Sequence, residues 1–336
     1  IMKKILVIYT GGTIGMIKDS SNTLKPVNFG KITERVPELK HIDCSISHYT
    51  FKKLIDSSNV APEFYIELAE TIEKNYKVFD GFIILHGTDT MAYSASALSF
   101  MLENLSKPVI FTGSQLPLGA IRTDAKHNLI TAVEIAAGEK VIPEVCIYFN
   151  DQLFRGNRAE KFSSSQFDAF QSLNYPALVE AGTSLQYNEK FISKKSNKKL
   201  IVHKKLNPNI GLVRIFPGIT GNWLEHIFSV EGLKAVVLET YGSGNAPTAE
   251  NFLKTIKAAI NKGIIILNVS QCAGGKVEQG KYETSKKLKE MGVISGSDIT
   301  TEAALTKLMY LFGKYPTQPK KIQAELLKNL RGEMSN

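Results

Sequence analysis

The chain has 336 residues, of which 43% are hydrophobic and 22% charged, and its formal net charge at pH 7 is +9. This length suits two domains of ordinary size. No apolar stretch approaches the roughly 20 residues that span a bilayer, and no signal-peptide pattern opens the sequence, so we exclude a membrane protein and expect a cytoplasmic one.

The first part of the chain alternates short apolar runs with amphipathic segments. This alternation is typical of an α/β fold with a mostly parallel sheet, of the Rossmann-like or flavodoxin-like kind. Pro62 suits the first position of a helix, and Gly138 suits the end of one. The expected strands span residues 3–10, 43–50, 81–86, 108–112 and 145–149, and the expected helices span residues 62–76, 91–103 and 123–138.

A lysine-rich segment follows at residues 188–205, "NEKFISKKSNKKLIVHKK", and holds much of the positive charge. It has no interleaved aromatic stacking platform, so we interpret it as a solvated linker rather than a nucleic-acid groove. The three cysteines of the chain, Cys44, Cys146 and Cys272, are far apart and odd in number. They indicate a reducing compartment without disulfides, and no segment has metal-ligand spacing.

The alternation of strands and helices resumes after the lysine-rich segment. Strands are expected at residues 210–216, 235–241 and 263–269, and helices near residues 247–262 and 300–312. We therefore predict a larger N-terminal catalytic domain over residues 1–190, a linker over residues 191–209 and a smaller C-terminal α/β domain over residues 210–336.

Polar residues that directly follow strands are the first candidates for a site, because open parallel sheets bind ligands beyond the carboxyl ends of their strands. The glycine-rich turn "YTGGTIGMI" fits neither the dinucleotide fingerprint nor the P-loop. Its glycines instead allow the backbone to approach a small ligand and present Thr13 to it. The other candidate segments are "DSSN" (56–59), "HGTDT" (86–90), "GSQLP" (113–117) and "FNDQLFRGNRAEKF" (149–162).

Taken singly, each candidate also has a purely structural interpretation. Thr13 is then a turn residue, Lys161 a surface lysine and His86 a hydrogen-bonded residue at a strand end. The remaining residues are then helix caps or solvated side chains, with Thr88, Asp89 or Thr90 at a helix beginning near Met91 and Ser57 or Ser58 at the helix of Pro62.

Taken together, the candidates indicate a reaction. A threonine hydroxyl becomes a nucleophile when a neighbour takes its proton. Burial can lower the pKa of a lysine enough for that task, and a carboxylate can orient the lysine. Two threonines on glycine-rich turns, one followed by an aspartate, and a lysine on a later loop therefore suit acyl transfer at a small amide.

Several of these segments are also signatures of one family. "YTGGTIG" (Tyr9–Gly15) and "HGTDTMAYSASAL" (His86–Leu98) occur in order, and "GSQLP", "RGNRAEKF", "YGSGNAP" and "SQCAGGKV" extend the likeness over essentially the whole chain. The sequence resembles the bacterial L-asparaginases, and among them the cytoplasmic type I class. The resemblance implies a two-domain hydrolase that converts L-asparagine and water into L-aspartate and ammonia, without a metal or a cofactor.

The resemblance assigns catalytic roles to four residues. Thr13 matches the nucleophile that attacks the side-chain amide carbon of the substrate. Thr88, Asp89 and Lys161 match a second triad, in which the lysine deprotonates Thr88 and Thr88 acts on water or on the leaving group. The sequence departs from the family pattern at one position. Many relatives have a tyrosine there whose hydroxyl supports the nucleophile, whereas the best match here is Leu24, which cannot relay a proton. The group that activates Thr13 is left open.

The resemblance also implies how the substrate is held. Asp89 matches the residue that binds the α-amino group, and Ser57, with its neighbours, matches the loop that binds the α-carboxylate. Ser114 matches a position whose backbone carbonyl meets the amide nitrogen. The expected substrate-binding residues are Gly12, Asp56, Ser57, Ser58, Gly87, Thr88, Asp89 and Ser114.

In the C-terminal domain, some relatives have a second, regulatory asparagine site. The residues here that correspond to it are Glu239, Thr240, Ser270, Gln271, Cys272 and Thr301. The structural alternative is that "YGSGNAP" is a tight turn and Cys272 a small buried thiol. The resemblance further implies a homodimer or a homotetramer.

Two other functions compete with the hydrolase. One is the ammonia-supplying subunit of a tRNA-dependent amidotransferase, which would be expected to carry a further domain before the first signature. The other is a Rossmann-like binding module without catalysis, which would leave Lys161 and both threonines unexplained.

Overall fold

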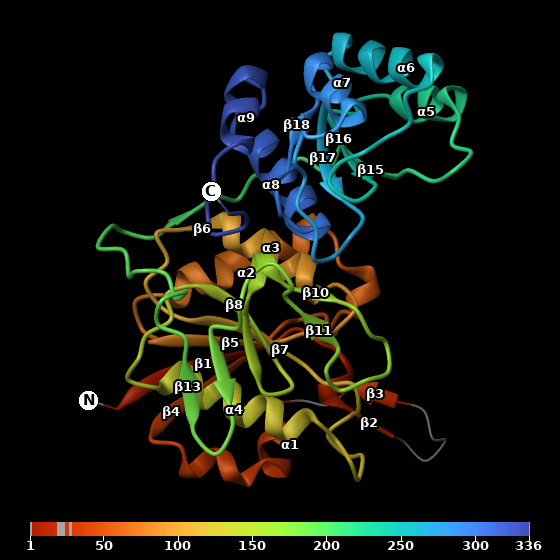
Figure 1. The fold of residues 1–336 in the computed structure, drawn as a ribbon. Coiled ribbons are helices and arrows are strands. Elements are labelled where there is room, and N and C mark those ends of the chain that lie inside the picture. Colours follow the sequence, from red (N-terminus) through yellow and green to blue (C-terminus); the bar gives the residue numbers. More distant parts are fainter. Residues whose placement is uncertain (1, 19–23, 27–28, 336) are drawn as a thin grey trace. The chain divides into compact units, whose positions relative to one another are not determined.

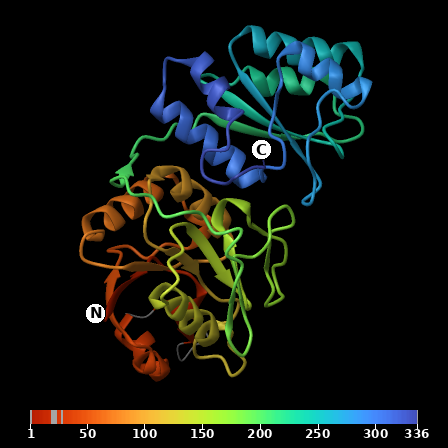
Figure 2. The same cartoon turned by 60° about the vertical axis from the view of Figure 1, so that its left-hand side comes forward.

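The computed structural model describes residues 2–18, 24–26 and 29–335. The chain divides into two compact units, Ile1–Lys204 and Lys205–Asn336. Each unit has its own sheet, mostly parallel in the first unit and parallel in the second, with helices packed against it (Figures 1 and 2). No helix among the described residues is both long and apolar enough to cross a membrane.

The sheet of the first unit has the strand order β13-β12-β9-β8-β7-β5-β1-β4. Strands β4, β1, β5, β7 and β8 are parallel, whereas β9, β12 and β13 run antiparallel to their neighbours. The bounds are β1 Lys3–Tyr9, β4 Cys44–Thr50, β5 Gly81–Leu85, β7 Val109–Thr112, β8 Val145–Phe149, β9 Gln152–Arg155, β12 Val179–Ala181 and β13 Leu185–Tyr187. The central strands are apolar along their length because helices cover both faces of the sheet.

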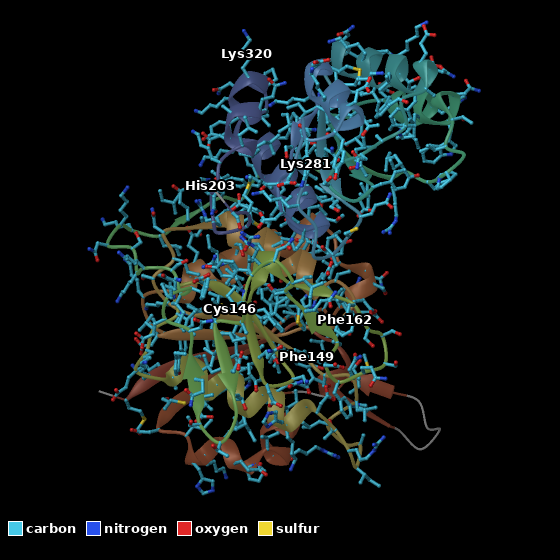
Figure 3. The ribbon with its side chains drawn as sticks, in the orientation of Figure 1. Cys146, Phe149, Phe162, His203, Lys281 and Lys320 are labelled. Carbon is cyan, nitrogen blue, oxygen red and sulfur yellow. The ribbon has the colours of Figure 1, made fainter. Side chains whose placement is uncertain are left out.

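Helices pack on the two faces of this sheet. Figure 1 shows α2 (Pro62–Asn75) and α3 (Met91–Met101) on one face, and α4 (Ala125–Ala137) with α1 (Phe29–Arg35) on the other. The α4 face forms a core in which Ile5 and Val7 of β1 cluster with Leu129 and Val133 of α4. Figure 3 shows Cys146 and Phe149 at the sheet of this unit; both residues are buried on β8.

Shorter elements connect these layers. They are β2 Met16–Lys18, β3 Leu24–Pro26, β6 Leu102–Glu103, β10 Glu160–Lys161, β11 Phe170–Gln171, β14 Ile201–Val202, and the 3-10 helices η1 Thr13–Gly15, η2 Pro37–His41, η3 Ser57–Asn59 and η4 Gly156–Arg158. Strand β14 comes from the lysine-rich segment and pairs with β6. The side chain of Leu24 lies outside the part of the chain that the structure describes.

The second unit has four parallel strands in the order β15-β16-β17-β18. One face forms a core with α5 to α7, through residues such as Leu224, Ile256 and Leu288, and α8 packs against β15 to β17. The bounds are β15 Ile210–Arg214, β16 Ala235–Thr240, β17 Ile265–Ser270, β18 Ile294–Ser295, α5 Gly221–Phe228, α6 Glu250–Asn261, α7 Glu283–Met291, α8 Thr301–Lys314 and α9 Pro319–Leu326. Lys320 projects outward from α9 (Figure 3).

The predicted fold class is confirmed, since each unit is built on parallel strands flanked by helices. The boundaries differ where a local interaction ends an element. The helix expected over residues 91–103 ends at Met101, because residues 102–103 turn into β6 and pair with β14. The helix expected from residue 123 begins at Ala125, because the Asp124 carboxylate accepts hydrogen bonds from the preceding loop.

Candidate active site

The turn after β1 is shaped by two glycines with positive φ. Gly11 has φ 131° and Gly12 has φ 86°, which disfavours any residue with a side chain. A Cβ atom on Gly12 would lie 2.5 Å from the backbone nitrogen of Gly87, which is too close for any real contact. The two signature segments therefore touch backbone to backbone. This contact places Thr13, the first residue of η1, next to the turn that follows β5.

The turn after β5 is anchored by His86, which is buried. Its Nδ1 lies 2.6 Å from the Gly87 carbonyl oxygen, and its Nε2 lies 2.9 Å from Ser94 Oγ. Burial lowers the pKa of His86 from 6.5 to about 4, so the ring is neutral, donates from Nδ1 and accepts from the serine hydroxyl. The interpretation of His86 as a hydrogen-bonded residue at a strand end is confirmed.

Lys161 joins the two residues that follow Gly87. Its Nζ donates to Thr88 Oγ1 at 2.7 Å and to Asp89 Oδ1 at 2.7 Å. Its side chain is 16% exposed, whereas that of Asp89 is 63% exposed. Lys161 is therefore no ordinary surface lysine: it reaches from β10 to a hydroxyl and a carboxylate that lie far away in the sequence.

The structure contradicts the interpretation of Thr88, Asp89 and Thr90 as helix caps. Thr90 occupies the N-cap position of α3, but no side chain caps this helix. The Thr90 hydroxyl instead donates to the Ser57 carbonyl oxygen at 2.8 Å. The side chains of Thr88 and Asp89 instead accept hydrogen bonds from Lys161.

Ser57 and its neighbours form η3 beside the same turn. The Asp56 carboxylate accepts from Ser58 N at 3.0 Å and from Ser58 Oγ at 2.9 Å, and these hydrogen bonds lower the pKa of Asp56. Ser57 is buried, and a Cβ atom on Gly87 would lie 2.5 Å from its Oγ. Neither serine caps α2, which begins at Pro62 after Ala61 without a side-chain cap.

The loop after β7 contributes Gln115. Its side chain donates from Nε2 to the Gln166 carbonyl oxygen at 2.9 Å and accepts from Thr88 Oγ1 at 3.5 Å. Ser114 is buried, and its hydroxyl donates to the Leu116 carbonyl oxygen at 2.6 Å. The side chain of Ser114 thus holds the loop in place.

These segments enclose a cavity of about 220 Å³. Its lining residues are Gly12, Thr13, Met16, Asp56, Ser57, Gly87, Thr88, Asp89, Gln115, Lys161 and Ser164. All four expected catalytic residues are among them, as are Gly12, Asp56, Ser57 and Gly87. Ser58 and Ser114 are not among the lining residues that the structure describes. This volume suits a small metabolite, because pockets for drug-sized ligands begin near 300 Å³.

Three lining residues were not predicted from the sequence. Gln115 belongs to the "GSQLP" segment, which does follow a strand, so its position was a usable signal. Ser164 lies three residues beyond Lys161, and its only signal is that proximity. Met16 follows the first signature and has no chemical signal of its own.

In the second unit, several of the residues proposed for regulation lie together at the carboxyl ends of β16 and β17. Thr301 Oγ1 donates to Glu239 Oε1 at 2.6 Å. Gln271 Nε2 donates to the carbonyl oxygens of Ile215 at 2.7 Å and Glu239 at 3.0 Å. Glu239, Gln271 and Thr301 therefore form one polar cluster, together with Arg214, whose Nη1 lies 3.5 Å from Glu239 Oε2.

The other three residues of that set have different surroundings. Thr240 is buried and donates to Asn268 Oδ1 at 2.6 Å, and Ser270 donates to the Gly242 carbonyl oxygen at 2.6 Å. Cys272 is exposed. The expectation of a small buried thiol was wrong, because Cys272 lies in the turn beyond the end of β17, with its backbone nitrogen bonded to Ser270 Oγ.

The "YGSGNAP" segment is the tight turn that the structural alternative expected. Tyr241 and Asn245 exchange backbone hydrogen bonds of 2.9 and 2.8 Å. Gly242 and Gly244 have positive φ angles of 50° and 103°, so glycine suits both positions.

Comparisons with known proteins match the chain over nearly its full length. The family model for "Asparaginase, N-terminal" matches residues 4–193, and that for "Glutaminase/Asparaginase C-terminal domain" matches residues 209–326. L-asparaginase 1 of Escherichia coli K12 is 44% identical over 341 residues, covering 99% of this chain and 98% of the relative. The crystal structure of L-asparaginase I from Vibrio cholerae superposes with a TM-score of 0.92 at 40% identity, covering all of both chains.

A more distant relative is named as a subunit of an amidotransferase. One of the subunits of the glutamyl-tRNA(Gln) amidotransferase of Pyrococcus abyssi is 30% identical over 346 residues, which cover 99% of this chain and 77% of the relative.

Proposed function

The chain belongs to the asparaginase family, and from this premise we propose that it hydrolyses the side-chain amide of L-asparagine to L-aspartate and ammonia. The observation that carries the proposal is the contact of Lys161 Nζ with both Thr88 Oγ1 and Asp89 Oδ1, each at 2.7 Å, in a cavity that Thr13 also lines. This arrangement supplies two hydroxyl groups, a base and a carboxylate within a volume that suits one amino acid.

In the first step, the Thr13 hydroxyl attacks the amide carbon of the substrate. The C–N bond breaks, the nitrogen gains the proton that the Thr13 hydroxyl loses and leaves as ammonia, and an aspartyl ester remains on Thr13. The backbone of Gly12 and Gly87 lines the cavity. Its N–H groups are therefore the candidates for binding the negatively charged oxygen of the tetrahedral intermediate.

In the second step, water hydrolyses this ester and returns a proton to Thr13. We assign the activation of water to Thr88, whose own proton passes to Lys161 Nζ. The 2.7 Å contact, in which Nζ donates to Thr88 Oγ1 in the structure, is the path for that transfer, and Nζ in its neutral form is the acceptor of the proton. Asp89 orients the lysine through the second 2.7 Å contact.

The remaining lining residues hold the ends of the substrate. Asp89 is exposed enough to meet the α-amino group as well as Lys161. Ser57, buried beside Gly87 and next to Asp56, is assigned to the α-carboxylate, and the backbone carbonyl of Ser114 to the amide nitrogen. The Ser58 hydroxyl is bonded to Asp56, so we assign it a supporting role in that loop.

The proposal is tested by measuring ammonia release from free L-asparagine by the purified chain, with no RNA and no partner protein. Turnover under these conditions supports the hydrolase. Release of ammonia only in the presence of a tRNA-charging partner would favour the amidotransferase subunit, which the more distant relative brings into consideration. No release in either case would leave a binding module.

We also propose a regulatory site in the second unit. The polar cluster of Glu239, Gln271 and Thr301 lies at the carboxyl ends of two parallel strands, with Cys272 exposed nearby. If asparagine binds there, a sigmoidal dependence of rate on asparagine should become hyperbolic in Cys272→Phe, with the maximal rate retained. A hyperbolic wild-type curve would end this proposal.

Two further proposals concern the assembly and the compartment. We propose that the chain forms a homodimer or homotetramer, as the family resemblance implies, and light scattering after size-exclusion chromatography would decide between them. We also propose that it works in the cytoplasm. Cys44, Cys146 and Cys272 are all free thiols, which suits a reducing compartment.

A further inference from the structure

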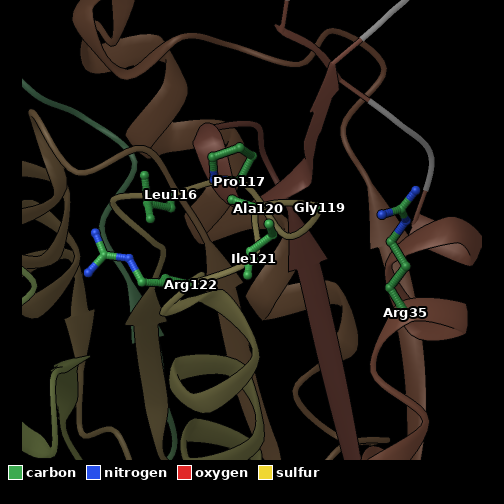
Figure 4. Close-up of a pocket in the computed structure, with 7 residues that line it drawn as sticks. All are labelled: Arg35, Leu116, Pro117, Gly119, Ala120, Ile121 and Arg122. Atoms are coloured by element: carbon green, nitrogen blue, oxygen red, sulfur yellow. The ribbon is translucent and has the colours of Figure 1, made fainter.

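A second and larger cavity, of about 540 Å³, lies beside the loop that follows β7. Figure 4 shows its lining, with Arg35 from the last turn of α1 at one end and Arg122 at the other. Leu116, Pro117, Ala120 and Ile121 line the cavity between the two arginines. This cavity shares no lining residue with the candidate active site.

The loop that forms the cavity is held by its own hydrogen bonds. Ala120 N donates to the Pro117 carbonyl oxygen at 2.9 Å, and Thr123 N donates to that of Ala120 at 3.3 Å, so two turns follow each other. Leu116 is fixed at both ends of its backbone: its nitrogen donates to Asp124 Oδ1 at 3.0 Å, and its carbonyl accepts from Thr123 Oγ1 at 3.1 Å. The cavity is therefore preformed, which lowers the entropy lost on binding a ligand.

The two arginines carry positive charge that nothing in the described part of the chain neutralises. None of the hydrogen bonds or ion pairs among the described residues involves the Arg35 or Arg122 guanidinium. The nearby acidic groups are already engaged. Asp124 accepts from two backbone nitrogens, and Glu38 lies 3.6 Å from Lys126. Guanidinium groups bind carboxylates and phosphates through paired hydrogen bonds.

The wall between the arginines is apolar and partly exposed to solvent. The Ile121 side chain is fully exposed, at 104% of its reference area. Arg35 approaches the loop closely at Gly119, where an added Cβ atom would lie only 3.1 Å from Arg35 Nη1. An apolar ligand body in the cavity would remove Ile121 and Leu116 from water. We propose that this cavity binds a small organic anion with an apolar body, its acidic group on an arginine and its hydrocarbon against Leu116 and Ile121.

The first test uses the fluorescent probe 8-anilinonaphthalene-1-sulfonate, which combines an acidic group with an apolar body. The full-length protein should bind it saturably, with one site of this kind per chain. Loss of charge-assisted hydrogen bonds should weaken binding in Arg35→Gln/Arg122→Gln by at least about tenfold. Ala120→Phe, which fills the cavity and keeps both arginines, should weaken it similarly.

Lys126→Gln is the control, because it removes one positive charge nearby, as the single variant Arg122→Gln does, without altering the cavity lining. It should change the affinity less than about twofold. Circular dichroism establishes that each variant is folded. If the double variant does not fold, the single variant Arg122→Gln replaces it in the test. Equal affinity in the wild type and the folded arginine variants would overturn the proposal, as would the absence of saturable binding.

Competition experiments then separate the acidic group from the apolar body. Octanoate and octyl phosphate should both displace the probe, whereas octanol should not, and inorganic phosphate should compete only at far higher concentration. Displacement by octanol as readily as by octanoate would show an apolar site without a role for the arginines. Displacement by inorganic phosphate as readily as by octyl phosphate would show an anion site without a role for the apolar wall. Either result would overturn the proposal.

Discussion

Thr13 and Thr88 line the same cavity but differ in their hydrogen-bonding partners. Thr88 Oγ1 accepts from Lys161 and donates to Gln115 at 3.5 Å, whereas no hydrogen bond of the Thr13 side chain occurs among the described residues. A hydroxyl without a fixed partner is available to a substrate, and one held by a lysine is placed to move a proton. On this difference we base the proposal that Thr13 is the nucleophile and that Thr88 activates water.

The first prediction follows from that difference. In Thr88→Val, which keeps the shape but loses the hydroxyl, hydrolysis of the ester should slow more than its formation. An aspartyl adduct should then accumulate on Thr13, as measured by intact mass and peptide mapping. Lys161→Met should behave alike, and the losses of the two variants should not add in the double variant, because both residues serve one step.

Thr13→Ala is the control for this experiment, since it should lose turnover and show no adduct. An adduct mapped to Thr88, or one that persists in Thr13→Ala, would make Thr88 the nucleophile.

The second prediction concerns His86, whose pKa burial lowers from 6.5 to about 4. Between these values the unfolded chain binds a proton that the folded chain does not, so stability is full above pH 6.5 and falls as the pH falls towards 4. At pH 5 this loss amounts to about 2 kcal/mol. His86→Gln, which has no titrating group, should lose correspondingly less stability between pH 7 and pH 5 in urea unfolding followed by circular dichroism.

His127→Gln is the matched control, because His127 is exposed and pairs with Asp151 on the surface. It should keep the pH dependence of the wild type. If His86→Gln also keeps it, the buried ring is not the group responsible.

At the scale of elements, the site depends on how closely the turn after β1 approaches the turn after β5. Both Gly12 and Gly218 have positive φ, 86° and 99°, so alanine is strained at either position. They differ in surroundings: a Cβ atom on Gly12 would lie 2.5 Å from Gly87 N, whereas one on Gly218 would meet nothing within 4 Å. The pair therefore separates backbone strain from steric conflict.

The third prediction compares these two glycines. Gly12→Ala should push Thr13 and the Gly87 turn apart and lower kcat/KM by about 100-fold or more, since displacements near 1 Å have that effect. Gly218→Ala should lose only about 1 kcal/mol of stability and keep its activity. Steady-state kinetics and thermal unfolding of both variants decide the matter, and comparable kcat/KM for the two would refute the steric argument.

The sequence predicted most of the elements that carry the candidate catalytic residues, because those elements follow simple rules. Residues 81–85 are apolar and wholly buried, so both the strand and the site beyond its carboxyl end could be inferred. Strands β9, β12 and β13 were missed because they are three or four residues long and antiparallel within a mostly parallel sheet. Tertiary pairing, rather than local pattern, defines them.

The difference between local pattern and tertiary contact also explains which residues of the cavity lining could be predicted. Thr13, Thr88 and Asp89 directly follow strands, and Lys161 was found through its chemistry and the family signature. Gln115 also follows a strand, but the contact by which its amide bridges Thr88 and the Gln166 carbonyl oxygen joins two loops and has no sequence pattern. Ser58 was expected to line the cavity, but its hydroxyl is bonded to Asp56.

At the scale of the whole molecule, different interactions stabilise the two units. The first unit has a large sheet with helices on both faces. The second has only four parallel strands, and its C-terminal segment is fastened by a buried ion pair. Lys307 Nζ lies 2.6 Å from Glu333 Oε1 and donates to the carbonyl oxygens of Leu326 and Lys328, and neither charged side chain is exposed.

The Glu333 carboxylate also accepts hydrogen bonds from backbone nitrogens near it. It accepts from Leu330 N at 3.0 Å and Arg331 N at 2.6 Å. The residues that follow α9 are thereby folded back over α8. Two buried charges with satisfied partners add little net stability compared with an apolar pair, but removing one leaves the other buried and unpaired.

The last prediction is that Lys307→Met destabilises the second unit by about 3–5 kcal/mol, because the Glu333 carboxylate is left without its cation. Adding Glu333→Gln should recover part of that loss, so the double variant should be more stable than the sum of the single variants predicts. Trp223, the one tryptophan of the chain, lies on α5 of this unit, so urea unfolding followed by its fluorescence reports on the second unit. Lys328→Met is the control, because the Lys328 side chain is 61% exposed and its ion pair with Glu325 should contribute less than about 1 kcal/mol. Equal losses in Lys307→Met and Lys328→Met would show that the buried pair does not hold the C-terminal segment in place.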